Sequence, residues 1–284
     1  MKPVIASVIS NEKVIRELER RKRPEARNIL GTWLMWLRCP EIAQEAKPGQ
    51  FVMVRCAEDC MLPRPLSIHN VNDKDKIALL FAVWEDGKGT QWLSRLKKSD
   101  NVITFGPPGN GFTLPDTPQE ILLVAGGIGI APMPFVANQA KKEKHSVKLF
   151  RGASGEDKPS GKPNPPQHLP EELLPRWLET KTIASSRDGK KNMVTDLILE
   201  YPQYVKEADQ IFACGPTAMY RQMAEMPELK GKPVQVSLEA RMGCGRGLCY
   251  ACTIRTRQGL KQVCKDGPVF NLNDIIWDEM SLSV

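Results

Sequence analysis

The sequence has no run of eighteen consecutive apolar residues, which is about the length that a membrane-spanning helix needs. Its first ten residues, MKPVIASVIS, also lack the basic start and the long apolar stretch of a secretory signal peptide. We therefore expect no membrane span and a cytoplasmic protein. The 284 residues, 41% hydrophobic and 26% charged, have the composition of an ordinary globular protein and suffice for two or three domains.

Histidine is scarce, and no nucleic-acid-binding motif is present. The three histidines, His69, His145 and His168, lie far apart, and none stands beside paired carboxylates or a nucleophile. The sequence therefore shows no obvious site at which this chain would process a substrate by itself. The net charge of +7 comes without an RNA- or DNA-binding motif, so phosphate-bearing cofactors or an acidic partner protein explain it better than nucleic acid.

Half of the eight cysteines lie in one short stretch near the C-terminus. Cys244, Cys249 and Cys252 follow the pattern C-x4-C-x2-C, and eleven residues separate Cys252 from Cys264. This is the spacing of plant-type [2Fe–2S] clusters, whose two irons need four thiolates. A structural zinc site would show two C-x2-C pairs, and only one is present. We therefore predict a [2Fe–2S] cluster on these four residues.

The other four cysteines are predicted to be reduced thiols, because a disulfide framework suits a small secreted chain. They are Cys39, Cys56, Cys60 and Cys214.

Short strand-like segments separated by turns predict an antiparallel β-barrel in the N-terminal part. Residues 4–9, 29–37 and 51–56 are such segments, and the basic stretch 11–28 is interpreted as a solvated excursion between two of them. The motif RPLS (64–67) ends a further strand. There Arg64 can hold a pyrophosphate with two hydrogen bonds, and Ser67 can face a flavin ring.

The motif GKGT (87–90) precedes QWLSRL, which is helix-like, with Thr90 available as its N-cap. Glycines that lead into a helix N-terminus form an anion site. Each motif alone is weak, since R-P-x-S is often only a strand end and GKGT only a capped loop. Together they describe one dinucleotide whose phosphates lie between a strand and a helix.

A second domain begins at ILLVAGGIGIAP (121–132), where four apolar residues in a row favour a buried parallel strand. Gly126, Gly127 and Gly129 follow, and a helix is expected from Met133. The pattern is not G-x-G-x-x-G, yet strand, glycine turn and helix form a phosphate-binding arrangement. A later apolar strand ends in a Cys-Gly-Pro turn (214–216), at the sheet edge where open α/β sheets bind ligands.

In this order of barrel, nucleotide-binding domain and cysteine-rich tail, the chain resembles the ferredoxin–NADP reductase superfamily. More closely, it is similar to the electron-transfer subunits of NAD-linked (class 1B) dihydroorotate dehydrogenases. The motifs that carry the resemblance are RPLS (64–67), GKGT (87–90), GPPGNGF (106–112), AGGIGIAP (125–132), CGPTAM (214–219), LEARMGCGRGLCYAC (238–252) and VCKDGPVF (263–270).

The resemblance implies an FAD-binding barrel over 1–116, an α/β NAD(P)-binding domain with a parallel sheet over 117–232, and a small [2Fe–2S] domain over 233–284. It also implies which residues serve each cofactor. The FAD set is Arg64, Pro65, Leu66, Ser67, Phe81, Ala82, Val83, Gly89 and Thr90. The nicotinamide set is Gly126, Gly127, Gly129, Arg187, Cys214, Gly215 and Pro216, with Cys214 and Ser67 as the candidate catalytic residues.

Nicotinamide exchanges electron pairs as hydride and a [2Fe–2S] cluster takes single electrons, so the flavin must lie between them. The resemblance implies a partner subunit that carries FMN and oxidises dihydroorotate in pyrimidine biosynthesis, within a heterotetramer. Two alternatives remain open: an NAD(P)H–ferredoxin-type reductase or electron-bifurcating subunit with another partner, and a non-catalytic iron–sulfur redox sensor. We expect NAD, although Ser186 and Arg187 stand where NADP-using relatives bind the 2′-phosphate.

Overall fold

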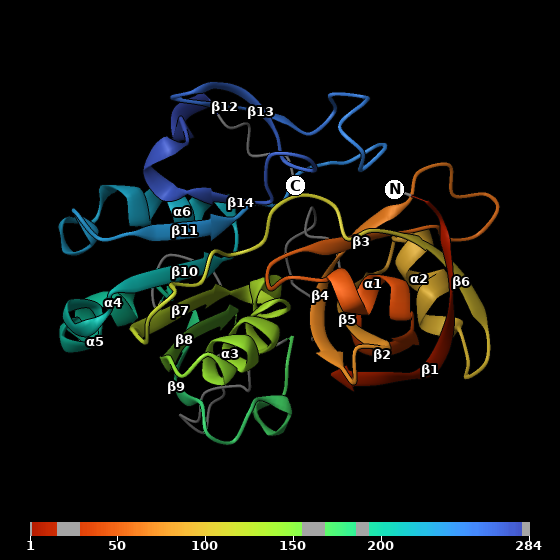
Figure 1. Cartoon of the computed structure of the whole chain (residues 1–284), viewed down its shortest axis with the longest axis horizontal. Coiled ribbons are helices and arrows are strands. Elements are labelled where there is room, and N and C mark those ends of the chain that lie inside the picture. Colours follow the sequence, from red (N-terminus) through yellow and green to blue (C-terminus); the bar gives the residue numbers. More distant parts are fainter. Residues whose placement is uncertain (1, 16–28, 155–167, 186–192, 280–284) are drawn as a thin grey trace.

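The computed structural model describes residues 2–15, 29–154, 168–185 and 193–279, which form a barrel, an α/β sheet and a C-terminal segment that adjoins both (Figure 1). The barrel is closed, in the strand order β1-β2-β5-β4-β3-β6, and every neighbouring pair is antiparallel. Its strands are β1 (Val4–Ile15), β2 (Ile29–Arg38), β3 (Phe51–Val54), β4 (Arg64–Asn72), β5 (Lys76–Trp84) and β6 (Asn101–Phe105). The predicted barrel is therefore confirmed.

Strand β5 explains how the barrel and the second domain fit together. Its side chains alternate between two sides, as they do in any strand. Leu79 and Phe81 belong to the barrel core, whereas Leu80 between them packs into the core of the α/β domain. Because both sides are covered, nearly the whole strand is buried. Helices α1 (Pro40–Glu45) and α2 (Lys88–Arg95) complete the barrel.

The α/β domain is built on a six-stranded sheet in the order β14-β11-β10-β7-β8-β9. The five parallel strands are β7 (Glu120–Gly126), β8 (Ser146–Ser154), β9 (Glu179–Ser185), β10 (Gln210–Cys214) and β11 (Val234–Ser237). Helix α3 (Met133–Lys142) covers one face of the sheet. The other face is covered by α4 (Asp196–Glu200), α5 (Pro202–Glu207) and α6 (Thr217–Glu225).

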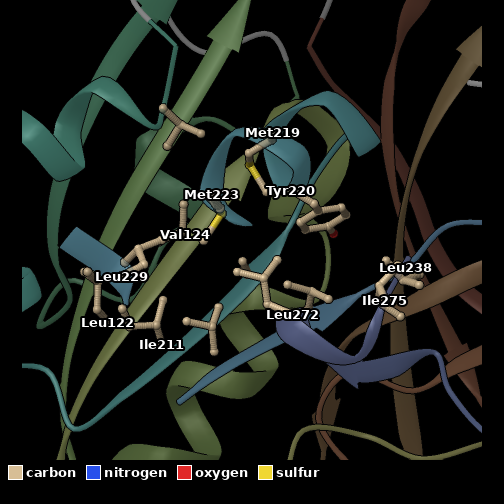
Figure 2. Packing of buried hydrophobic residues seen from close by; sticks show 14 of the residues in the cluster. Leu122, Val124, Ile211, Met219, Tyr220, Met223, Leu229, Leu238, Leu272 and Ile275 are labelled. Carbon is tan, nitrogen blue, oxygen red and sulfur yellow. The ribbon is translucent and has the colours of Figure 1, made fainter. Parts of the chain in front are cut away.

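The C-terminal segment shares both sheet and core with the α/β domain. Strand β14 (Val269–Asn271) adds antiparallel to β11, so the sheet continues past residue 232 into the cysteine-rich part. Figure 2 shows Leu238 and Leu272 of this segment in one apolar core with Tyr220 of α6. The hairpin β12 (Thr253–Thr256) and β13 (Gly259–Gln262) completes the segment.

Three sequence expectations differ in detail from the structure. The motif RPLS (64–67) begins strand β4 instead of ending a strand. The stretch 11–28 was interpreted as an excursion, but residues up to Ile15 continue β1, and 16–28 lie outside the described residues. Thr90 was expected to cap α2, but Gly87 takes that position, and the Thr90 hydroxyl donates to the Gly87 carbonyl at 3.2 Å. None of the helices in the described ranges is long and apolar enough to cross a membrane.

Candidate functional site

A cavity of about 640 Å³ lies where the three parts of the molecule meet. From the barrel it is lined by Arg64, Pro65, Leu66, Ser67, Phe81, Ala82 and Thr90. From the α/β domain it is lined by Gly126, Gly127, Gly152, His168, Cys214 and Pro216, and from the C-terminal segment by Ser237, Leu238, Glu239, Ala240, Arg241, Met242 and Pro268. Most of the residues predicted to bind FAD and nicotinamide are therefore brought to one space.

The barrel side of the cavity has a positive end. Arg64 begins β4, and its side chain lies against the first turn of α2, where a Cβ on Gly89 would stand 3.0 Å from the Arg64 Nε. Glycine at this position therefore lets the guanidinium approach the helix N-terminus, whose amides have no partner within the helix. The two features together are suited to an anion such as a phosphate. Gly89 itself lies behind the cavity wall rather than on it.

The predicted set on β5 divides between the cavity and the barrel interior. Ala82 is on the outward side of the strand and lines the cavity, as does Phe81. Val83 is fully buried in the barrel core and does not line the cavity. Alternation along the strand places Val83 on the inward side, away from the outward Ala82, while Phe81 belongs to the barrel core and also reaches the cavity.

On the α/β side, the glycine turn after β7 meets the turn after β10. Gly126 and Gly127 line the cavity, and Gly127 has a φ of +56° that favours glycine. Gly129 does not line it. A Cβ at Gly129 would stand 2.0 Å from the carbonyl oxygen of Cys214, so this glycine allows the two turns to touch.

Cys214 and Pro216 line the cavity, while Gly215 between them faces Met219, whose Cε would be 2.6 Å from a Cβ there. The Cys214 thiol is only 3% exposed. Burial and the nearby charge of Glu239 raise its pKa, so it stays protonated and is not a thiolate nucleophile. Arg187, the candidate for contact with a 2′-phosphate, lies outside the described residues.

Glu239 is a site residue to which sequence reasoning assigned no role. Its side chain lines the cavity and is exposed there, yet the protein atoms around the carboxyl desolvate it and raise its pKa. A carboxyl group placed directly after the last parallel strand and before the cysteine loop is the signal that could have identified it. It gives the cavity an acid that can hold a proton at a higher pH than an ordinary glutamate.

The four predicted ligand cysteines converge in two pairs. Cys244 is hydrogen-bonded to Cys249, and Cys264 to Cys252. Among the described residues, no group of three or more His, Cys, Asp or Glu is arranged to hold one metal ion. Two pairs suit a cluster in which two irons share four thiolates, whereas a single zinc ion would gather all four ligands around one point.

Backbone amides of the loop point at these sulfurs. The Arg246 and Leu248 amides donate to the Cys244 Sγ at 3.3 and 3.4 Å, and the Gly247 amide donates to the Cys264 Sγ at 3.2 Å. Partial burial alone would raise the pKa of Cys244, but the amide hydrogen bonds overcome it and lower the pKa to about 7. The loop is therefore shaped to stabilise thiolates, and it fits an iron–sulfur cluster.

The cysteine loop also lies against the barrel. A Cβ on Gly245 would stand 2.4 Å from the Cγ of Met53 on β3, and the Arg246 guanidinium lies 4.7 Å from the ring centroid of Phe105 on β6. Met242, two residues before the first ligand, lines the cavity. The predicted cluster is thus close to the predicted flavin.

Comparison with known proteins agrees with this arrangement. Residues 239–276 match the family model of the iron–sulfur cluster binding domain of dihydroorotate dehydrogenase B, and residues 123–225 match that of the oxidoreductase NAD-binding domain. The dihydroorotate dehydrogenase B (NAD(+)) electron transfer subunit of Desulforamulus reducens is 37% identical over 87% of this chain and 93% of its own. That of Clostridium acetobutylicum is 35% identical over 83% of this chain and 88% of its own.

The chain belongs to the family of dihydroorotate dehydrogenase B electron transfer subunits.

Solved structures agree with the fold of this family. The NADH-dependent reduced ferredoxin-NADP oxidoreductase, studied for flavin-based electron bifurcation, superposes with a TM-score of 0.76 at 26% identity, over 97% of this chain and 91% of the other. The ferredoxin reductase of carbazole 1,9a-dioxygenase gives a TM-score of 0.62 at 18% identity, over 83% and 68% of the two chains, and shows the fold alone.

Proposed function

We infer that this chain is the electron transfer subunit of an NAD-linked dihydroorotate dehydrogenase and carries FAD, a [2Fe–2S] cluster and a site for NAD. The observation that carries the inference is the single cavity lined by the barrel, the glycine turn and the segment that leads into the cysteine loop. Its partner is a catalytic subunit that carries FMN and oxidises dihydroorotate in pyrimidine biosynthesis, and we expect the two to form a heterotetramer.

Different residues of the chain bind the FAD pyrophosphate, face the flavin ring and form the wall on the nicotinamide side. Arg64 and the N-terminus of α2 hold the FAD pyrophosphate, while Ser67 and Ala82 face the flavin ring. When bound, the flavin exchanges electron pairs with nicotinamide and single electrons with the cluster. The buried Cys214 and the exposed Pro216 form the wall on the nicotinamide side, and neither acts as a nucleophile.

Glu239 supplies the proton-holding group of this cavity. Its raised pKa keeps the carboxyl protonated to a higher pH than usual, within reach of the space that the flavin and nicotinamide would share. Two-electron reduction of a flavin takes up protons while the cluster takes none. Glu239, between the cavity and the cluster loop, therefore lies where electrons pass on to the cluster and protons stay behind at the flavin.

We propose NAD rather than NADP as the nicotinamide, and a cytoplasmic location, which suits eight cysteines of which none forms a disulfide. We also propose the division of the chain into residues 1–116 for FAD, 117–232 for the nicotinamide nucleotide and 233–284 for the cluster. In this division, β11 and β14 of the last part serve the sheet of the second.

A second candidate function has one specific observation in its favour. The superposition on the NADH-dependent reduced ferredoxin-NADP oxidoreductase extends over nearly the whole chain, the cysteine-rich segment included. A subunit of a bifurcating complex would use the same three cofactor sites with a different partner. The two candidate functions therefore differ in the partner protein that receives or supplies electrons at the cluster loop.

The test is purification of the native complex from the source cells, followed by assays on the complex. We expect a co-purifying FMN protein and reduction of NAD⁺ by dihydroorotate. Co-purification of a larger flavoprotein together with ferredoxin-dependent activity, and no oxidation of dihydroorotate, would favour the second candidate.

A further inference from the structure

Tyr220 is a buried polar side chain that the proposed function does not yet use. It lies in the first turn of α6 and is 1% exposed. Its ring lies in the core shared by the sheet and the C-terminal segment (Figure 2). There it packs beside the ring of Trp277, with 5.5 Å between the centroids. A tyrosine this deeply buried needs partners for its hydroxyl, since an unpaired one is costly.

The hydroxyl has two backbone partners, at two neighbouring strand ends. It accepts a hydrogen bond from the Gly215 amide at 2.7 Å and donates one to the Ser237 carbonyl at 2.6 Å. Cys214 and Ser237 are the last register pair of the parallel strands β10 and β11. The Tyr220 hydroxyl therefore joins the two chains just where the backbone ladder between them stops.

Both joined segments are walls of the cavity. Cys214 and Pro216, on either side of Gly215 in the chain, line it, as do Ser237 at the end of β11 and Glu239 two residues further on, but Tyr220 itself does not reach it. The Cys214 thiol is also hydrogen-bonded to Tyr220 and Ser237. Any effect of Tyr220 on the cavity must therefore act through these neighbours.

We propose that Tyr220 is a positioning residue for hydride transfer: its hydroxyl fixes the Cys214–Pro216 wall against the nicotinamide and ties this wall to the strand that enters the cluster loop. This rests on the proposed function. In that transfer a C–H bond of the reduced nicotinamide breaks, and the hydrogen with its electron pair moves to the flavin, which is reduced as the nicotinamide is oxidised. Misplacement of reacting groups by about 1 Å can slow such a step on the order of a hundredfold.

The test compares Tyr220→Phe with Tyr204→Phe in the purified, cofactor-loaded protein, together with its partner where the two co-purify. Phe keeps the ring packing and removes only the hydroxyl. Tyr204 on α5 is a matched control, because its hydroxyl also donates a hydrogen bond, in this case to Glu179. Neither Tyr204 nor Glu179 lines the cavity. NADH-dependent dye reduction gives kcat and KM, and anaerobic mixing with NADH gives the long-wavelength absorbance of the nicotinamide–flavin pair.

For Tyr220→Phe we expect full flavin and iron content, a fall in kcat of about tenfold or more, and a KM for NADH within about threefold of the original. The long-wavelength absorbance should weaken, and Tyr204→Phe should change none of these. If Tyr220→Phe lowers only the melting temperature, with kcat and absorbance unchanged, the residue is structural and the proposal is wrong.

Should Tyr220→Phe lose its cofactors, Trp277→Phe takes its place, because it keeps the hydroxyl and lets the Tyr220 ring shift. The proposal then requires a smaller fall in kcat in the same direction, and unchanged kinetics would overturn it. Failure of the proposed function would be recognised separately, because the unmodified protein itself would then lack the cluster or not oxidise NADH.

Discussion

At the scale of single residues, the cluster ligands give the sharpest expectation. Cys252 is buried and paired with Cys264, so Cys252→Ala leaves one iron with a single protein thiolate. We expect loss of the cluster's visible absorbance and of acid-labile sulfide. Cys39→Ala, which changes an equally buried thiol in the barrel core, should keep both. Retention of two irons and two sulfides in Cys252→Ala would contradict the ligand assignment.

Arg64 provides a second residue-scale prediction. Its guanidinium lies on the first turn of α2 at the edge of the cavity, so Arg64→Ala removes a charge-assisted contact to the pyrophosphate. The loss should cost about 1.5–3 kcal/mol of FAD binding, which is roughly a 10- to 150-fold rise in the dissociation constant. Arg55→Ala, an exposed arginine just after β3, is the control and should bind FAD normally. Equal affinities in the two variants would place the pyrophosphate elsewhere.

At the scale of elements, His69 links β4 of the barrel to the α/β domain. Its Nδ1–H donates to the Ala131 carbonyl just before α3 at 2.7 Å, and burial lowers its pKa from 6.5 to about 4. The unfolded chain therefore takes up a proton at a higher pH than the folded chain does. The stability that depends on neutral His69 is complete above about pH 6.5 and is lost as the pH falls towards 4.

The variant His69→Asn tests this, because the Asn amide can make the same donation but does not titrate. Between pH 6.5 and pH 4 we expect the wild-type protein to lose on the order of 3 kcal/mol more unfolding free energy than the variant loses. Urea unfolding of the cofactor-loaded protein at several pH values measures the difference. Parallel curves for the two proteins would show that His69 does not titrate in this way.

The elements also show what the sequence can reveal. The glycine turn after β7 and the cysteine loop were predictable because each depends on a local pattern: a turn that needs glycine, or a spacing that brings thiolates together. The addition of β14 to the sheet and the role of Tyr220 were not, because both depend on pairing between segments far apart in the chain. Glu239 stands in a sequence motif, but its raised pKa depends on the protein atoms that the fold brings around the carboxyl at the cavity.

At the scale of the whole molecule, the cysteine loop has one side on the barrel and another open to solvent. Arg246 lies over Phe105, so it is already engaged within the chain. Leu248, between the first two ligands, is 73% exposed. An exposed apolar side chain beside the cluster suits the surface through which single electrons pass to a partner subunit.

Leu248→Glu should therefore weaken assembly with the catalytic subunit, because burial of the new carboxylate in an interface is costly. Leu260→Glu is a matched control, since Leu260 is 68% exposed on the hairpin strand β13. We expect size-exclusion chromatography to show at least a tenfold weaker complex for Leu248→Glu only, with the cluster retained. Normal assembly of Leu248→Glu would place the partner on another surface.

The central claim is that one cavity connects nicotinamide, flavin and cluster within this chain. Anaerobic titration of the purified protein with NADH, followed by visible absorbance and electron paramagnetic resonance, tests it most directly. The account predicts uptake of about three electrons per chain, two by FAD and one by the cluster, with the spin signal of a reduced [2Fe–2S] cluster growing as the flavin bleaches. A flavin that bleaches fully while the cluster stays oxidised, even with excess NADH, would contradict the account.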